Sequence, residues 1–313
     1  MLRPYQGAWY GVRKNRSNRS VTSPVARSSE VRVEVVANRE TAPAYFSMRL
    51  AVPPRLARFR PGQFLMLGWD EGWDPFLPRA MSIRSAKCGV RGAGWEVEIL
   101  YKIFGRGTAV LAAMRPGRFL RALGPLGNAF EVPRSATEII MVAGGIGVPP
   151  IAALAESLAT RRASRRMEMT VLLGGRSKAD LLCVADFRRA GAKVHMATED
   201  GSVGFKGLVT DLLEQFLCTP HHAPRQGRSK HRPYRAPRTV LYACGPHAML
   251  AALAPIAEKY DLPYQASLEA NMACGFGACM GCVVPVKGGE GHRTYRLVCK
   301  DGPVFDAHGI LWA

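Results

Sequence analysis

Four cysteines near the end of the chain place the strongest constraint on its fold. Cys274, Cys279, Cys282 and Cys299 have the spacing C-x4-C-x2-C-x16-C, whereas the other four cysteines are isolated. Eight cysteines among 313 residues do not describe a disulfide scaffold, so the cluster favours metal ligation. The spacing is that of plant-type [2Fe–2S] proteins, in which four thiolates hold two irons. A zinc site with four cysteine ligands is the alternative, but zinc sites more often pair two short knuckles, and one is present here.

The positive charge of the chain is concentrated in two segments. The formal net charge is +19, but residues 1–29 and 219–238 each carry six Lys or Arg and no acid, which leaves +7 for the rest. Residues 1–29 lack the apolar stretch of a secretory signal and are interpreted as a disordered basic tail, with an organelle transit peptide as the alternative. Residues 219–238 are interpreted as a mobile surface insertion. No nucleic-acid-binding motif accompanies the charge, so we expect that the protein binds no nucleic acid. Because no secretory signal is recognised, we expect the protein in the cytoplasm.

Short strands separated by turns predict an antiparallel β-barrel over residues 30–133. The candidate strands are Val31–Val36, Tyr45–Leu50, Gln63–Trp69 and Trp95–Ile103. Closely spaced strands of this kind, without helical stretches between them, are typical of small barrels.

Strands then alternate with helices, which predicts a parallel α/β domain over residues 134–265. The expected strands are Glu138–Val142, Met169–Leu173, Val194–Ala197 and Thr239–Ala243, and the expected helices are Pro149–Ala159, Leu181–Ala190, Leu208–Leu217 and Met249–Lys259. Ile139–Ala155 is the stretch most similar to a membrane span, but its glycine and proline pairs divide it into strand, turn and helix. Residues 266–313 form a small cysteine module, so the fold class is α+β with several domains and no membrane segment.

Glycines and a cysteine follow two of the predicted parallel strands. Gly144, Gly145 and Gly147 lie where a dinucleotide pyrophosphate can approach backbone amides and a helix N-terminus. Their spacing is not G-x-G-x-x-G, and many α/β turns are glycine-rich for packing reasons alone. Cys244, Gly245 and Pro246 end the last parallel strand, beyond which ligands of open sheets bind. We therefore expect NAD here, with Cys244 near the hydride path as a candidate catalytic residue; the alternative is a small buried core cysteine.

The barrel carries motifs suited to an anionic cofactor. Arg79, Ala80, Met81 and Ser82 offer a cation and a hydroxyl at the start of a strand, and Leu100, Tyr101 and Lys102 follow. Gly107 and Thr108 have the pattern of an anion-binding turn at a helix start, with Arg79 as the counter-charge for a phosphate. Each motif alone also arises by chance.

The order of these motifs resembles the ferredoxin–NADP reductase superfamily and, within it, the electron transfer subunits of class 1B dihydroorotate dehydrogenases. The resemblance covers roughly residues 30–313. Besides the motifs above, the segments that carry it are Gly124–Asn128, Glu199–Ser202, Gly207–Thr210, Ser267–Glu269, Met272–Gly275 and Cys299–Phe305. Met81 departs from the pattern, because related flavoproteins often have Tyr there. The basic segments 1–29 and 219–238 are not family features.

The resemblance implies three cofactors and a partner. FAD would be held by Arg79, Ala80, Met81, Ser82, Leu100, Tyr101, Lys102, Gly107 and Thr108, and the [2Fe–2S] cluster by Cys274, Cys279, Cys282 and Cys299. It implies that electrons leave dihydroorotate at the FMN of a separate catalytic subunit and pass through the cluster and FAD to NAD, in pyrimidine biosynthesis. The two subunits would form a heterotetramer with two copies of each, and this chain would not oxidise dihydroorotate alone.

Two choices remain open at this stage. The alternative function is that of an NAD(P)H reductase subunit whose partner is ferredoxin, a hydrogenase or a sulfur-reducing enzyme. The run from Ser267 to Gly275 favours dihydroorotate dehydrogenase as the partner. Arg176 and Lys178 follow a strand where they could meet the 2′-phosphate of NADP, or they form a solvated turn, and the resemblance favours NAD.

Overall fold

The computed structural model describes residues 30–70, 74–89, 94–162, 167–219, 239–288 and 293–312. The predicted basic tail (1–29) and residues 220–238 of the predicted insertion therefore lie outside the described residues. No helix among the described residues is long and apolar enough to cross a membrane.

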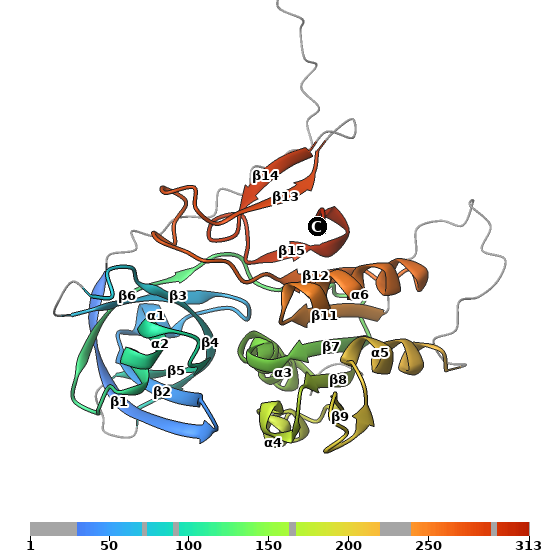
Figure 1. Ribbon diagram of the computed structural model, residues 1–313, viewed down its shortest axis with the longest axis horizontal. Coiled ribbons are helices and arrows are strands. Elements are labelled where there is room, and N and C mark those ends of the chain that lie inside the picture. The colour runs from blue at the N-terminus through green and yellow to red at the C-terminus, as the bar shows by residue number, and fades with distance from the viewer. Residues whose placement is uncertain are drawn as a thin grey trace, which may run out of the picture.

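Six antiparallel strands close into the predicted barrel, at the lower left of Figure 1. They are β1 (Val31–Ala42), β2 (Tyr45–Val52), β3 (Phe64–Trp69), β4 (Arg79–Cys88), β5 (Trp95–Lys102) and β6 (Phe119–Leu126), in the order β1-β2-β5-β4-β3-β6. Alternation of apolar and charged residues favours this arrangement. In β1, Val33 and Val35 are buried, whereas Arg32 and Glu34 are charged and point to the other face of the strand. The barrel also contains two short helices, α1 (Pro54–Ala57) and α2 (Arg106–Ala112). The strand pattern did not predict α1, which begins with a proline and buries Leu56.

A seven-stranded sheet forms the second domain, with the order β10-β9-β8-β7-β11-β12-β15. Its strands are β7 (Glu138–Gly144), β8 (Glu168–Gly175), β9 (Lys193–Thr198), β10 (Phe205–Lys206), β11 (Thr239–Cys244), β12 (Tyr264–Ser267) and β15 (Val304–Asp306). Neighbours from β10 to β12 are parallel, and β15 is antiparallel to β12. The parallel sheet predicted from the alternation of strands and helices is thus confirmed.

Helices cover both faces of this sheet and create two separate cores. The helices are α3 (Val148–Arg162), α4 (Val184–Arg189), α5 (Val209–Leu217) and α6 (His247–Lys259), with the short 3-10 turns η1 (Gly145–Gly147), η2 (Lys178–Asp180) and η4 (Ala307–Gly309). One core contains Ile151 of α3 and Phe187 of α4, and the other contains Leu213 of α5 and Leu250 of α6. The face covered by α3 is turned toward the barrel, and α3 packs against β4 (Figure 1).

The connection after β8 differs from the prediction of one helix over Leu181–Ala190. The structure has η2 and then the shorter α4, and Cys183 precedes α4 with a left-handed φ of 59°. The helix begins three residues later than predicted, after a turn whose Asp180 side chain is bonded to the barrel. Local sequence carries no signal for such a contact.

The cysteine segment begins and ends in the nucleotide-binding sheet. It leaves at the end of β12, forms a hairpin of β13 (Val283–Lys287) and β14 (Arg293–Leu297), and returns as β15. The hairpin lies at the top of Figure 1, above the junction of barrel and sheet. The predicted domain boundary between residues 265 and 266 falls within β12. The limits of the domains remain a prediction.

Candidate functional site

A cavity of about 840 Å³ lies where the barrel, the parallel sheet and the segment before the cysteines meet. All nine residues predicted to hold FAD line it: Arg79, Ala80, Met81, Ser82, Leu100, Tyr101, Lys102, Gly107 and Thr108. The nucleotide-binding domain contributes Ile146 of η1, Pro149 of α3 and Cys244 of β11, and the segment before the cysteines contributes Ser267–Met272. Residues from all three parts of the chain therefore share one recess.

The residues predicted to bind a phosphate lie together in the wall of this cavity. The guanidinium of Arg79 lies directly against the Cα of Gly107. Thr108 orders the turn, because its hydroxyl accepts hydrogen bonds from the backbone N–H groups of Phe104 (2.9 Å) and Gly105 (3.2 Å). A cation thus lies beside the N-terminus of α2, which is an arrangement suited to a phosphate.

Two of the predicted FAD residues are largely inside the barrel. Met81 is buried in the barrel core together with Ile83. Tyr101 is buried as well, its hydroxyl donates to Asn38 Oδ1 (2.9 Å), and its ring stacks on Phe46. These two side chains reach only the edge of the cavity, whereas Ala80 and Ser82 on the same strand as Met81 are half-buried at its wall.

The residues predicted to bind NAD gather at the C-terminal ends of β7 and β11. These strands are hydrogen-bonded neighbours, with Cys244 opposite Ala143. A Cβ atom on Gly147 would overlap the backbone carbonyl of Cys244, so only glycine permits this approach. A Cβ on Gly245 would lie 3.0 Å from the backbone nitrogen of Gly144. The two turns are therefore interlocked at the edge where parallel sheets bind nucleotides.

Cys244 is buried at this edge and still contributes to the cavity wall. Burial strongly raises the pKa of its thiol, and the nearby carboxyl of Glu269 raises it further. A neutral thiol at this position can contact a bound ring but does not provide a thiolate nucleophile.

The four clustered cysteines form two pairs. The backbone N–H of Cys279 donates to Cys274 Sγ, and the backbone N–H of Cys299 donates to Cys282 Sγ, both at 3.4 Å. Within the described ranges, no three His, Cys, Asp or Glu side chains converge on the position of a single metal ion. Two pairs of thiols fit a two-iron cluster with four cysteine ligands.

Electrostatics differ between the two pairs. Burial opposes ionisation of Cys274, but N–H donors from Cys279 and Phe276 outweigh it and lower its pKa to about 6. The pKa of Cys299 is raised to about 12 by burial and by the neighbouring thiols of Cys282 and Cys274. The effect of Cys274 on the pKa of Cys299 couples the two pairs electrostatically.

The cysteine loop is packed on the barrel. A Cβ on Gly275 would clash with Met66 Cγ of β3 and would lie 3.2 Å from Leu126 Cδ1 of β6. Met66 is opposite Ala80 in the β3–β4 pair, and Ala80 lines the cavity. The cluster loop and the cavity therefore share one pair of strands.

Sequence reasoning missed two titratable residues at the site. Glu269 lines the cavity, and although its side chain keeps access to solvent there, desolvation by the surrounding protein raises its pKa. It lies in the Ser267–Glu269 run that carries the resemblance, so the signal was present without a role. Asp180 accepts a hydrogen bond from Tyr45, 135 positions away, and no local pattern reveals that contact.

A flavin-type barrel, a parallel nucleotide-binding sheet and a cavity between them define an oxidoreductase of the ferredoxin–NADP reductase class with an added cysteine module. The family model described as the oxidoreductase NAD-binding domain matches residues 141–254, which include both interlocked turns. The model described as the iron-sulfur cluster binding domain of dihydroorotate dehydrogenase B matches residues 269–311, which include all four clustered cysteines. The chain belongs to the family of electron transfer subunits of dihydroorotate dehydrogenase B (NAD(+)).

Two relatives illustrate the match. The electron transfer subunit of Desulforamulus reducens is 32% identical, over 89% of this chain and 97% of that protein. The subunit of Geobacillus thermodenitrificans is 37% identical, over 90% of this chain and 98% of that protein. The family predicted from the sequence, and its oxidoreductase character, are confirmed.

Solved structures confirm the fold. A chain from an NADH-dependent reduced ferredoxin–NADP oxidoreductase has a TM-score of 0.71 and 24% identity, over 90% of each chain. A ferredoxin NADP+ reductase from Neisseria gonorrhoeae, solved with FAD and NADP, has a TM-score of 0.53 and 18% identity, over 71% of this chain and 88% of that one.

Proposed function

We propose that this chain holds FAD and a [2Fe–2S] cluster and passes electrons from an FMN-containing catalytic subunit that oxidises dihydroorotate to NAD+. The observation that carries the proposal is the shared cavity, which touches the barrel, the end of β11 and the segment leading to Cys274. Met272 lines the cavity, and the first cysteine follows two residues later. FAD supplies the chemistry that joins the two ends, because a flavin exchanges hydride with nicotinamide and single electrons with an iron–sulfur cluster.

The residues that would bind FAD are those of the cavity wall. Arg79 beside the N-terminus of α2 would neutralise the pyrophosphate, and Ser82 would offer a hydroxyl to the flavin ring. The apolar walls from Ala80 and Leu100 would exclude water from the ring.

The nucleotide would bind at the interlocked turns of Gly144 to Gly147 and Cys244 to Pro246. Cys244 and Ile146, one from each turn, also line the cavity, and we place Cys244 beside the nicotinamide. We keep NAD as the nucleotide, because the Arg176 guanidinium that could bind a 2′-phosphate lies 3.6 Å from Asp180 and is partly neutralised.

The partner would dock on the cysteine side of the molecule. Several large apolar side chains in this region are exposed to solvent, and they are Phe276, Met280, Val283 and Tyr295. Phe276 and Met280 flank Cys279 in the cluster loop, and exposed apolar side chains of this kind mark protein interfaces. We name these four residues the cluster-side patch. A partner seated on it would cover the cluster loop and shorten the path for electrons.

The proposal includes a heterotetramer with two copies of each subunit, in the cytoplasm. Support for the location is that none of the eight cysteines, all of which are among the described residues, forms a disulfide, which suits a reducing compartment. The mass of the purified complex tests the stoichiometry.

Co-expression with an FMN-containing dihydroorotate dehydrogenase subunit tests the function. The expected result is a stable complex that reduces NAD+ with dihydroorotate, whereas neither subunit alone does so. Cys274→Ser should abolish NAD+ reduction while the catalytic subunit still passes electrons from dihydroorotate to an artificial acceptor. Cys88→Ser, at an exposed thiol of the barrel, is the matched control and should behave as wild type. A complex in which Cys274→Ser keeps full NAD+ reduction would contradict the proposal.

A further inference from the structure

A buried carboxylate joins the barrel to the nucleotide-binding sheet. Asp180, at the end of η2, has only 8% of its surface exposed. Its Oδ1 atom accepts a hydrogen bond from the Tyr45 hydroxyl at 2.5 Å and lies 3.3 Å from the Lys102 ammonium. Lys102 Nζ also donates to the Tyr45 hydroxyl at 2.9 Å. One oxygen of Asp180 is therefore occupied by two residues of the barrel, from β2 and β5.

The second oxygen of Asp180 faces the loop that follows β8. Oδ2 accepts a hydrogen bond from the backbone N–H of Arg176 at 3.0 Å, and the Arg176 side chain lies 3.6 Å away. Burial alone would raise the pKa of Asp180, but hydrogen bonds from Tyr45, Arg176 and Lys102 lower it overall. An ionised carboxylate thus holds the barrel on one side and the loop on the other.

Both ends of this bridge belong to proposed binding surfaces. Lys102 lines the cavity. The loop at Gly175 and Arg176 ends the strand next to β7, which is where parallel nucleotide-binding sheets receive the adenosine ribose. Tyr45 also approaches the glycine turn of β7, since its hydroxyl would lie 4.0 Å from a Cβ on Gly145. The bridge therefore reaches the Gly175–Arg176 loop, the glycine turn after β7 and the cavity wall at Lys102.

We propose that Asp180 is a positioning residue, which fixes the Gly175–Arg176 loop relative to the Lys102 wall of the cavity. The adenosine half of the nucleotide would bind to the loop. The position of the loop would therefore align the nicotinamide ring with the flavin ring. The inference rests on the proposed function, which it deepens by naming what aligns the two sites.

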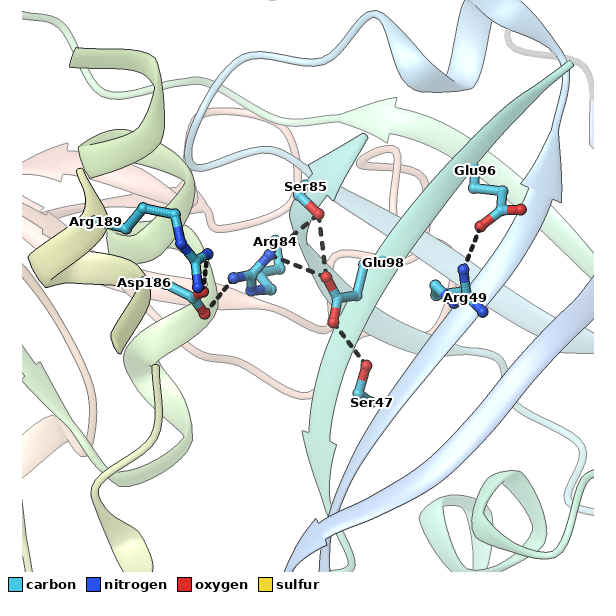
Figure 2. A network of polar contacts seen from close by, with 8 residues as sticks. All are labelled: Ser47, Arg49, Arg84, Ser85, Glu96, Glu98, Asp186 and Arg189. Carbon is cyan, nitrogen blue, oxygen red and sulfur yellow. Dashed lines mark hydrogen bonds and ion pairs between the residues drawn. The ribbon is translucent and has the colours of Figure 1, made fainter. Parts of the chain in front are cut away.

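A second polar bridge between the same two domains provides the matched control. Arg84 of β4 is 8% exposed and pairs with Glu98 of β5 (2.9 Å) and with Asp186 of α4, as Figure 2 shows. Asp186 also binds Arg189 at 2.8 Å. This bridge joins the barrel to α4, a few residues after η2, but neither Arg84 nor Asp186 is among the residues that line the cavity. Asp186→Asn therefore removes an interdomain charge without touching the loop at Arg176.

The experiment compares the purified full chain, loaded with FAD and cluster, as wild type, Asp180→Asn, Tyr45→Phe and Asp186→Asn. The affinity for AMP, measured by isothermal titration calorimetry, reports on the loop alone. The rate of flavin reduction by NADH, measured by stopped-flow absorbance, reports on the position of the loop relative to the cavity.

The three variants have different expected signatures. Asp180→Asn should lower AMP affinity about tenfold, because the Arg176 N–H loses a charged acceptor. Tyr45→Phe removes only the barrel side, so it should keep AMP affinity within about twofold but slow flavin reduction about tenfold. Asp186→Asn should leave both measurements within about twofold of wild type while lowering the melting temperature.

The outcomes separate this inference from the proposed function. If Asp180→Asn and Tyr45→Phe match Asp186→Asn in both measurements, the inference is overturned. If Asp180→Asn folds poorly, Tyr45→Phe decides alone, because it leaves the carboxylate and its bond to Arg176 in place. A wild-type chain that binds neither AMP nor NADH would instead contradict the proposed function, and the positioning role with it.

Discussion

Gly275, the residue after the first cysteine of the cluster motif, lies against the Met66 side chain in the wall of the barrel. The backbone of Gly275 has a left-handed φ of 79°, so both its conformation and the close approach require glycine. This contact sets the cluster loop against the strand pair β3–β4, whose Ala80 lines the cavity. The relationship explains how a loop far along the chain is held near a cofactor site built from early strands.

Gly275→Ala should loosen the cluster. The substitution forces a left-handed residue and a clash with Met66, at a cost of about 1–3 kcal/mol. We expect less iron per chain and about tenfold faster bleaching of the cluster absorbance by a chelator. Gly281→Ala is the control, because its Cβ would meet only Cys279 Sγ at 3.6 Å, an ordinary contact. Equal bleaching rates in the two variants would show that the contact with Met66 is unimportant.

Gly147→Ala should impair nucleotide binding. The new Cβ would overlap the Cys244 carbonyl and push the N-terminus of α3 away from β11, which costs about 1–3 kcal/mol of stability. The expected result is a lower melting temperature and at least tenfold weaker NADH binding by calorimetry. Gly309→Ala, where no atom lies within 4 Å of the built Cβ, should change neither quantity. Wild-type NADH affinity in Gly147→Ala would contradict the assignment of these turns to the nucleotide.

Phe276→Asp should weaken the complex with the catalytic subunit. Phe276 is 56% exposed, and a charge in the centre of an apolar interface costs about tenfold or more in affinity. The side chain is not a cluster ligand, so the visible spectrum of the isolated chain should be unchanged. Leu208→Ser, at an apolar residue exposed just before α5, should leave the affinity as in wild type. If Phe276→Asp binds the catalytic subunit as tightly as wild type, measured by surface plasmon resonance, the cluster-side patch is not part of the interface.

The pH dependence of stability should change in Glu269→Gln. Desolvation by the surrounding protein raises the pKa of Glu269 above its ordinary value near 4.5, although the side chain keeps access to solvent, so the folded state favours the protonated carboxyl. The contribution of this group to stability is therefore fully present below about pH 4.5 and is lost as pH rises through the raised pKa. Glutamine stays neutral, so the amount by which the melting temperature of the variant exceeds that of wild type should grow as pH rises above about 4.5 and level off once the pH passes the raised pKa. A constant difference across this range would mean that Glu269 has the same pKa in the folded and unfolded states, which would contradict the raised pKa.

The parts of the structure with a local signal were predictable from the sequence. Alternating residues such as Val33 and Val35 revealed barrel strands, and the glycines at 144, 145 and 147 marked the end of β7. Cysteine spacing alone indicated the iron–sulfur module, because four ligands must converge within a short segment.

Contacts between distant segments were not predictable. The bond of Asp180 to Tyr45, which lies just before the shortened helix α4, joins residues 135 positions apart. The three-residue strand β15 is too short for an alternation pattern, so its return to the sheet beside β12 emerged only from the structure. The cavity itself is the product of such contacts, which is why its residues could be proposed by resemblance but not brought together by periodicity.

Anaerobic reduction of the isolated, fully loaded chain by NADH tests the central claim most directly. If one cavity connects the nucleotide edge, the flavin wall and the cysteine loop, excess NADH should bleach the flavin absorbance and produce the electron paramagnetic resonance signal of a reduced [2Fe–2S] cluster. Dithionite provides the reference for full cluster reduction. Bleaching of the flavin by NADH with a silent cluster, in a chain whose cluster dithionite reduces, would contradict the account.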